Sequence, residues 1–171
     1  VLLTMAAPTD LVQSRGTVSW VLWTPDDPDV QHGVVSNLIT AYGHRMYGER
    51  GAGVPNYPNP PTGMRLGSGS ADSTYTGAGS AIETYVAGSF RALADIPASS
   101  MPGAWRRIIY TCVWPVGVAT TTIREVVLTN ESPLTDIPGI DANTIARAVF
   151  PTPIIKTANS GLTVVWTHDL E

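Results

Sequence analysis

The sequence RIIYTCVW, at residues 107–114, is the clearest strand pattern in this chain of 171 residues. Successive side chains of a β-strand point to opposite faces, so alternate residues share a face. One face of this segment is largely apolar and comprises Ile108, Tyr110, Cys112 and Trp114. The other carries Ile109, Thr111 and Val113. The pattern predicts a β-strand that ends before Pro115, because proline cannot donate to a strand ladder.

Three more strand patterns follow in the C-terminal third, at residues 120–129, 144–150 and 162–167. Pro151 and Pro153 are expected to interrupt the second of these, with Ile154-Ile155 resuming it. Short strands at this spacing, with turns between them, are typical of antiparallel all-β folds. The sequence therefore predicts a mainly β chain, either an antiparallel β-sandwich or a jelly-roll-like barrel.

The N-terminal part divides at about residue 15. Residues 1–15 show no period and are expected to be an arm, whereas residues 16–171 are expected to form a single β-rich domain. The segment TVSWVLWT, at 17–24, has apolar side chains on both faces. Burial on both sides indicates the interior of a sandwich or a contact between subunits.

One amphipathic helix is predicted over about residues 29–47. Asp27 can cap it and Pro28 suits the first helical position. Apolar residues then recur at a spacing of four: Val34, Leu38, Tyr42 and Met46. Long loops rich in Pro and Gly are expected at 48–63 and 94–104. The pattern at 81–86 fits a helix or a strand equally well.

Composition limits the function classes. Charged residues make up only 14% of the chain, hydrophobic residues 43%, and the net charge is −4. A negative chain with few cations lacks the basic surface that binds nucleic acid, so no nucleic-acid partner is expected. No apolar run of about 18 residues occurs, so no membrane-spanning helix and no membrane partner are expected.

The residues capable of catalysis form no recognised motif. His32 and His44 are too far apart along the predicted helix to bind one metal ion, so no metal site and no cofactor are expected. Nucleophile-elbow, phosphate-loop and dinucleotide patterns are all absent from the sequence. Cys112 lies inside a strand and is interpreted as a core thiol. The sequence thus assigns no catalytic, cofactor-binding or metal-ligating residue and predicts that the chain is not an enzyme.

Arg124 and Glu125 are neighbours on a predicted strand and must point to opposite faces. One interpretation places Glu125 at a sheet edge in water. The other places it in an arginine–carboxylate pair, buried or at an interface, with Arg147 as a candidate partner. The sequence leaves both open. For the five tryptophans, packing in the core or at an interface is favoured over stacking on a sugar or nucleic acid.

Several strings occur in an order that resembles a diffuse group of tailed-bacteriophage virion proteins, partly similar to tail-collar fibre proteins. They are SNLITAYG at 36–43, MRLGSGS at 64–70, IREVVLTN at 123–130, IARAVF at 145–150 and LTVVWTH at 162–168. The group is marked by leu-Gly-thr-Gly, Ile-x-Glu-x-Gly-Leu, Ala-Arg-x-x-Phe and Leu-x-Val-x-Trp-Thr segments. The resemblance covers residues 36–168 and departs at Val127, where the group often has Gly.

The resemblance implies a non-enzymatic structural protein of the virion, made in the cytoplasm of a bacterial host. It implies a homo-oligomer at the neck, collar or tail, with itself and other virion proteins as partners. The alternative is a capsid decoration (cement) protein that stabilises capsomer junctions. A carbohydrate-binding module or glycan-directed enzyme is a third hypothesis. The residues expected to contact other subunits are Trp20, Trp23, Tyr57, Arg124 and Arg147.

Overall fold

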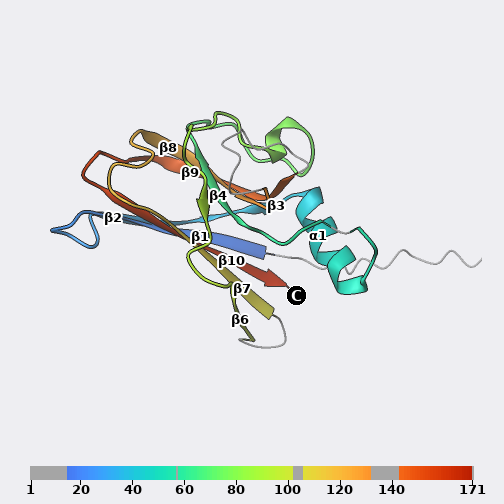
Figure 1. The fold of residues 1–171 in the computed structure, drawn as a ribbon. Helices are drawn as coiled ribbons and strands as arrows, with labels where there is room; N and C mark the ends of the chain where they lie inside the picture. The colour runs from blue at the N-terminus through green and yellow to red at the C-terminus, as the bar shows by residue number, and fades with distance from the viewer. Residues whose placement is uncertain (1–14, 57, 102–105, 132–142, 171) are drawn as a thin grey trace, which may run out of the picture.

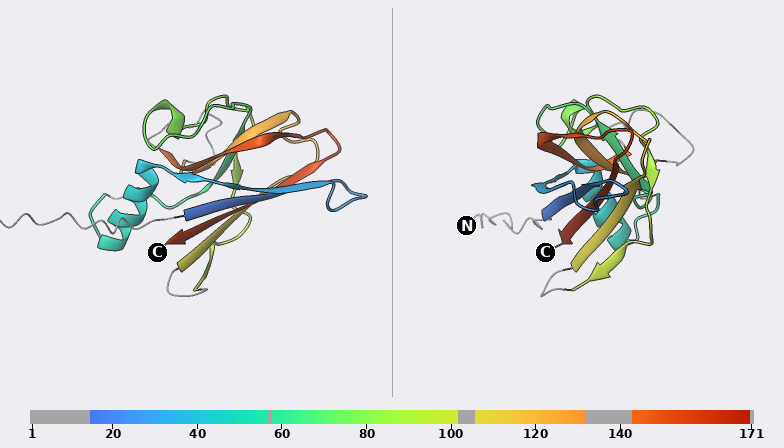
Figure 2. Two further views of the ribbon diagram at one scale, coloured as in Figure 1. Left: turned by 180° about the vertical axis from the view of Figure 1, so that it is seen from behind. Right: turned by 90° about the vertical axis from the view of Figure 1, so that its left-hand side faces the viewer.

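Two five-stranded antiparallel sheets pack face to face in the computed structural model, which describes residues 15–56, 58–101, 106–131 and 143–170 (Figures 1 and 2). The first sheet has the strand order β2-β1-β10-β7-β6, and the second has the order β3-β9-β8-β4-β5. The predicted mainly β fold and β-sandwich are confirmed. The closed, jelly-roll-like barrel is wrong, because no pairing between the described strands joins the two sheets.

The strands of the first sheet are β1 (Arg15–Trp23), β2 (Gln31–Ser36), β6 (Ala98–Ser100), β7 (Arg106–Trp114) and β10 (Gly161–Leu170). Those of the second are β3 (Leu38–Ile39), β4 (Gly63–Gly67), β5 (Arg91–Ala92), β8 (Thr122–Thr129) and β9 (Thr144–Ile155). The described helices are α1 (Ala41–Ala52) and the short 3-10 helix η1 (Ala78–Ser80).

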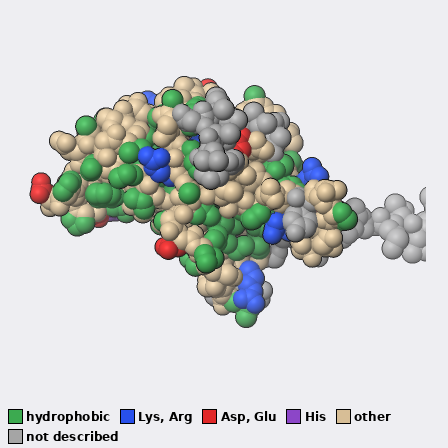
Figure 3. Space-filling model, viewed as in Figure 1, with side chains coloured by type: hydrophobic (Ala, Val, Ile, Leu, Met, Phe, Trp, Pro, Cys, Tyr) green, Lys and Arg blue, Asp and Glu red, His purple; other side chains and the backbone are tan. Residues whose placement is uncertain are grey.

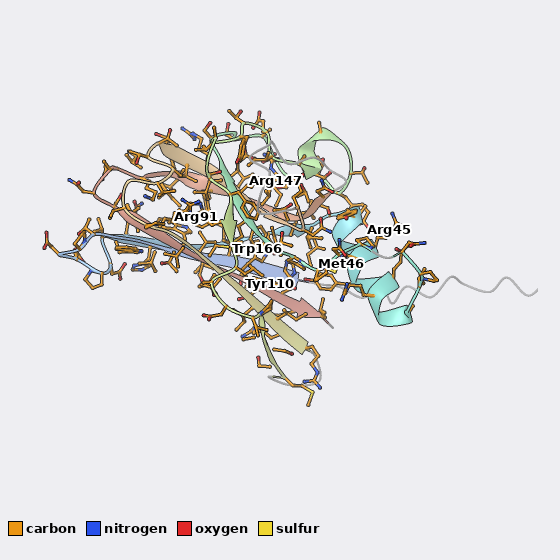
Figure 4. The ribbon with its side chains drawn as sticks, in the orientation of Figure 1. Arg45, Met46, Arg91, Tyr110, Arg147 and Trp166 are labelled. Atoms are coloured by element: carbon orange, nitrogen blue, oxygen red, sulfur yellow. The ribbon has the colours of Figure 1, made fainter. Side chains whose placement is uncertain are left out.

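The core lies between the sheets, where the predicted alternation is seen directly. In the register of β7 with β10, Tyr110 lies opposite Trp166 and Cys112 lies opposite Val164. These side chains are buried, and Met46 of α1 closes the same core at one end (Figure 4). Residues 107–114 therefore form the predicted strand, with their even-numbered face turned inward.

The helix predicted over 29–47 is wrong in its first half. Thr24 and Asp27 instead close a turn with two backbone hydrogen bonds, and the Asp27 side chain accepts from the Asp29 N–H. Such turns lead naturally into a strand. The next residues form β2, where Val34 lies opposite Ser19 of β1. A spacing of four satisfies both a helix and a strand, so Val34 and Leu38 did not distinguish the two.

Helix α1 begins only after Thr40, whose hydroxyl accepts from the Gly43 N–H at 3.0 Å. The same hydroxyl donates to the Thr144 carbonyl of β9, which fixes the helix end to the second sheet. A Cβ at Gly43 would lie 2.1 Å from the Ile145 carbonyl oxygen, so only glycine allows this approach. The helix runs to Ala52 and ends at Gly53 with φ of 67°, so it occupies the first part of the loop expected at 48–63.

The remaining expectations are met in part. Residues 81–86 form neither a helix nor a strand, apart from one bridge between Gly67 and Tyr85. Strand β6 lies within the loop expected at 94–104. Strand β9 continues through Pro151 and Pro153, although its pairing with β8 shifts register there. Residues 1–14 of the expected arm, and Tyr57, lie outside the described residues.

Thr40→Ala is expected to lower the free energy of unfolding by about 1–2 kcal/mol, because the substitution removes the helix cap and leaves buried backbone groups unpaired. Urea unfolding followed by tryptophan fluorescence measures the change. Thr40→Ser keeps the hydroxyl and is the matched control. If the serine variant loses as much stability as the alanine variant, the hydroxyl is not the cause.

Candidate functional site

The outer face of the second sheet carries a buried ion pair between Glu125 of β8 and Arg147 of β9. The two side chains are 0% and 1% exposed. Both Nε and Nη2 of Arg147 lie 2.9 Å from Oε2 of Glu125. The buried pair of the two sequence interpretations is thus confirmed, and the placement of Glu125 in water at a sheet edge is wrong. Arg124, at the irregularity in the pairing of β8 between Ile123 and Glu125, is partly exposed.

The same two side chains hold residues 68–84, which we call the covering segment. Glu125 accepts hydrogen bonds from the backbone N–H groups of Gly69, Glu83 and Thr84 at 2.9–3.1 Å. Arg147 donates to the Gly79 carbonyl at 2.9 Å. Hydrogen bonds from amides stabilise a buried carboxylate, as the arginine does. The covering segment, green in Figures 1 and 2, therefore lies on the second sheet because its backbone completes this pair.

A second buried pair joins Arg65 of β4 to Glu131. The Arg65 guanidinium lies 5.2 Å from the ring centre of Phe90 and 5.8 Å from that of Tyr85. Glu131 Oε1 accepts from the Asn143 amide at 2.6 Å. Cation–π contacts and hydrogen bonds of this kind offset the cost of removing both charges from water. This pair ties the end of β8 to β4.

Lys156 is a third buried charge and is 1% exposed. Its Nζ donates to the carbonyl groups of Pro115 and Ser160, at 3.0 and 2.6 Å. Burial lowers the pKa of this amine, because the charged form loses solvation. The side chain joins the turn after β7 to the turn before β10.

His168 of β10 lies in a buried polar cluster at the α1 end of the sandwich. Its Nδ1 lies 2.6 Å from the Tyr47 hydroxyl, and its Nε2 lies 2.9 Å from the Asn37 amide nitrogen. The Tyr47 hydroxyl is in turn 2.9 Å from that of Tyr110. These contacts satisfy both ring nitrogens of a neutral imidazole, and burial lowers the pKa of His168 to about 3.

Chemically reactive groups are either buried or dispersed. Cys112 is fully buried, and burial raises the pKa of its thiol to about 12, which fits the predicted core thiol. His32 contacts Asp29, and His44 contacts Tyr75. Among the described residues, no three His, Cys, Asp or Glu side chains are close enough to hold a metal ion. No described helix is long and apolar enough to cross a membrane.

The predicted contact residues occupy different environments. Trp20 is 5% exposed and packs edge-on against Phe150 with ring centres 6.1 Å apart. Arg147, labelled in Figure 4, is hydrogen-bonded to Glu125 and to the covering segment. Trp23 and Arg124 are partly exposed, and Tyr57 lies outside the described residues. That these residues contact another subunit stays a prediction; the contacts of Trp20 and Arg147 seen here are internal.

Sequence reasoning missed the Arg65–Glu131 pair, Lys156 and the His168 cluster. A signal existed for two of them, since Arg65 stands between Met64 and Leu66 and Lys156 follows Ile154-Ile155. A charged residue beside apolar residues in a strand pattern has one of two explanations. Its side chain is buried with a partner, or it lies on the face of the strand opposite the apolar side chains. The partners come from distant positions, so the sequence did not name them.

Glu125→Gln is expected to lower the free energy of unfolding by about 3–5 kcal/mol, because the buried Arg147 charge loses its close partner and keeps only Glu83, a 43% exposed carboxylate at 3.9 Å. Chemical denaturation of both proteins measures the loss. The matched control is Glu49→Gln, which removes the same charge from an exposed pair with Arg45 and is expected to cost less than about 1 kcal/mol. Equal losses in the two variants would contradict a special role for the buried pair.

Stability is expected to fall as the pH decreases from 6.5 towards 3. The unfolded chain takes up a proton at His168 near pH 6.5, whereas the folded chain resists this until about pH 3. Above pH 6.5, His168 is neutral in both states and does not lower the free energy of unfolding. Below pH 6.5, the free energy of unfolding falls by up to about 1.4 kcal/mol per pH unit, because only the unfolded chain binds the proton. Unfolding curves across this range measure the slope.

His168→Gln is expected to reduce that slope, and His32→Gln, which alters an exposed imidazole, is expected to keep it. An unchanged slope in His168→Gln would show that other groups control the acid response.

Comparison with known proteins assigns no family to this arrangement. No family model matches the chain, and neither the curated proteins nor the solved structures include a match.

Proposed function

We propose that the chain is a non-enzymatic structural component of a tailed-phage virion, assembling as a homo-oligomer at the neck, collar or tail. The order of the strings between residues 36 and 168 suggests the class. The observation that carries the proposal is the distribution of charge in the folded chain, which suits a subunit that neighbours cover.

The charged side chains are few, and several of them are turned inward. The chain has 10 Lys and Arg and 14 Asp and Glu in 171 residues. At least five of these 24 are no more than 7% exposed, namely Arg65, Glu125, Glu131, Arg147 and Lys156. Charged residues are almost never buried unless they are paired, and they normally keep a protein surface soluble. A chain that places them inside leaves its outer surface poor in charge, as the cores of subunit interfaces are.

The buried charges also fix the connecting segments. Glu125 and Arg147 hold the covering segment, and Lys156 holds two turns. Segments held in place by charge-assisted hydrogen bonds lose little entropy when they contact a neighbour. Fixed loops of this kind suit a particle component that must present one shape to every adjacent subunit.

The test is the number of copies in purified particles. Particles released from the host are separated on a density gradient, and this chain is quantified by mass spectrometry against the major shell protein. Few copies per particle support the neck, collar or tail. A copy number comparable with that of the shell protein supports the capsid decoration alternative instead.

Absence of the chain from purified particles would overturn the proposal. Turnover of a host polysaccharide that is lost on changing one carboxylate would also overturn it, in favour of a glycan-directed activity.

A further inference from the structure

The outer face of the first sheet is open. It is formed by the odd-numbered residues of β1, β7 and β10 and the even-numbered residues of β2 and β6, as the strand registers require. We call it the open face. The covering segment is hydrogen-bonded to the second sheet, whereas among the described residues no helix or strand outside the first sheet pairs with its strands. The two outer faces of the sandwich therefore differ.

The open face carries few charged residues, and most of them lie at one end of it. By register its charged positions are Arg15, Asp169 and Arg107, in one row at one end of the sheet, and His32 lies on the same face of β2. Arg107 and Asp169 form a bidentate pair at 2.8 and 3.0 Å. The other positions are mainly Thr, Ser, Val and Ile. Val34 and Val113 are 67% and 37% exposed on it. The solvent-facing side of an antiparallel sheet normally carries polar and charged side chains. The exposed aliphatic side chains of the open face are instead typical of a surface that another protein covers.

Trp23 extends the open face at its end. It lies opposite Gly161 of β10, and a Cβ at Gly161 would lie 2.2 Å from Cζ2 of the indole. The indole Nε1 donates to Oγ1 of Thr163 at 3.2 Å. The ring therefore lies against the sheet, held by its own polar atom. A fixed aromatic ring of this kind is a frequent element of protein interfaces.

We propose that the open face packs against the open face of a second copy of this chain. This inference rests on the homo-oligomeric part of the proposed function and names its surface. Away from the row of Arg15, Asp169 and Arg107, the face offers few charges for a charged partner to match, whereas a second open face matches it in hydroxyl and aliphatic groups. Two such sheets pack in the manner of the two layers of a sandwich.

The available area is sufficient for a stable pair. Strands about 4.8 Å apart with a rise of about 3.3 Å per residue give this sheet a face of roughly 600 Å². Two copies would bury roughly 1,200 Å², which is above the value of about 1,000 Å² expected of a specific interface. The side of the molecule drawn in Figure 3 takes in parts of both sheets, and hydrophobic side chains gather over its middle.

The test introduces a charge on the open face and measures the mass in solution. Val34→Lys and Val113→Lys change exposed side chains on β2 and β7, so the fold is expected to tolerate both. Ile155→Lys is the matched control, since Ile155 is 65% exposed on β9 of the second sheet. Sedimentation equilibrium gives the dissociation constant, and circular dichroism with thermal unfolding verifies the fold of each variant.

The wild-type chain is expected to form a dimer. Val34→Lys and Val113→Lys are each expected to raise the dissociation constant about 100-fold or more, because they bury lysine in an uncharged contact. Ile155→Lys is expected to leave it unchanged. A monomeric wild type, a dimer that survives both open-face changes, or a dimer that only Ile155→Lys breaks would each overturn the proposal.

These results are separable from the virion proposal. A chain present in particles but insensitive to lysine at positions 34 and 113 contradicts the open face as an interface and leaves the virion role in place. A dimer that these changes break, formed by a chain absent from particles, contradicts the virion role and supports the interface.

Discussion

The ion pair between Glu125 and Arg147 is the interaction on which the arrangement of this molecule depends. Neither charge can remain buried alone, because removing an ion from water costs several kcal/mol that only a partner and further hydrogen bonds offset. Four backbone groups of the covering segment, at Gly69, Gly79, Glu83 and Thr84, supply those bonds. The segment has little regular structure of its own, so the pair determines where it lies.

The pair also explains why the two outer faces of the sandwich differ. The second sheet places Arg65, Glu125 and Arg147 on its outer side, and these charges are buried beneath irregular chain. On the outer side of the first sheet the charged strand residues are confined by register to the row of Arg15, Asp169 and Arg107. A charged sheet face can organise loops through hydrogen bonds, whereas a face of Thr and Val offers a regular surface suited to another sheet. One outer face is thus completed by the chain itself, and the other is the one that we propose for contact with a second copy.

Local alternation was enough to predict the central strands. The patterns at 17–24, 107–114 and 162–167 correspond to β1, β7 and β10, since each has a buried inner face with period two. The pattern at 120–129 corresponds to β8, which is buried on both faces. The apolar pattern gave a wrong prediction at 29–47, because a spacing of four residues fits the helical period and the strand period alike. The turn closed by Thr24 and Asp27 leads into a strand there. The Glu125–Arg147 pair could be anticipated because both residues stand in apolar strands. The covering segment could not, since its contribution is made by backbone amides that any residue possesses.

The pairing of β1 with β10 has a consequence for the order of events during synthesis. β1 lies between β2 and β10, with Thr17 opposite Thr167 and Trp23 opposite Gly161. Contacts between residues so distant in sequence form slowly, because a long loop of chain must close first. The first sheet is therefore incomplete until residues 161–170 have left the ribosome, and a nascent chain holds only the β1–β2 hairpin and, later, β6 and β7. Any association through that sheet therefore requires chains in which β10 has already been made, which keeps shorter nascent chains on neighbouring ribosomes from joining prematurely.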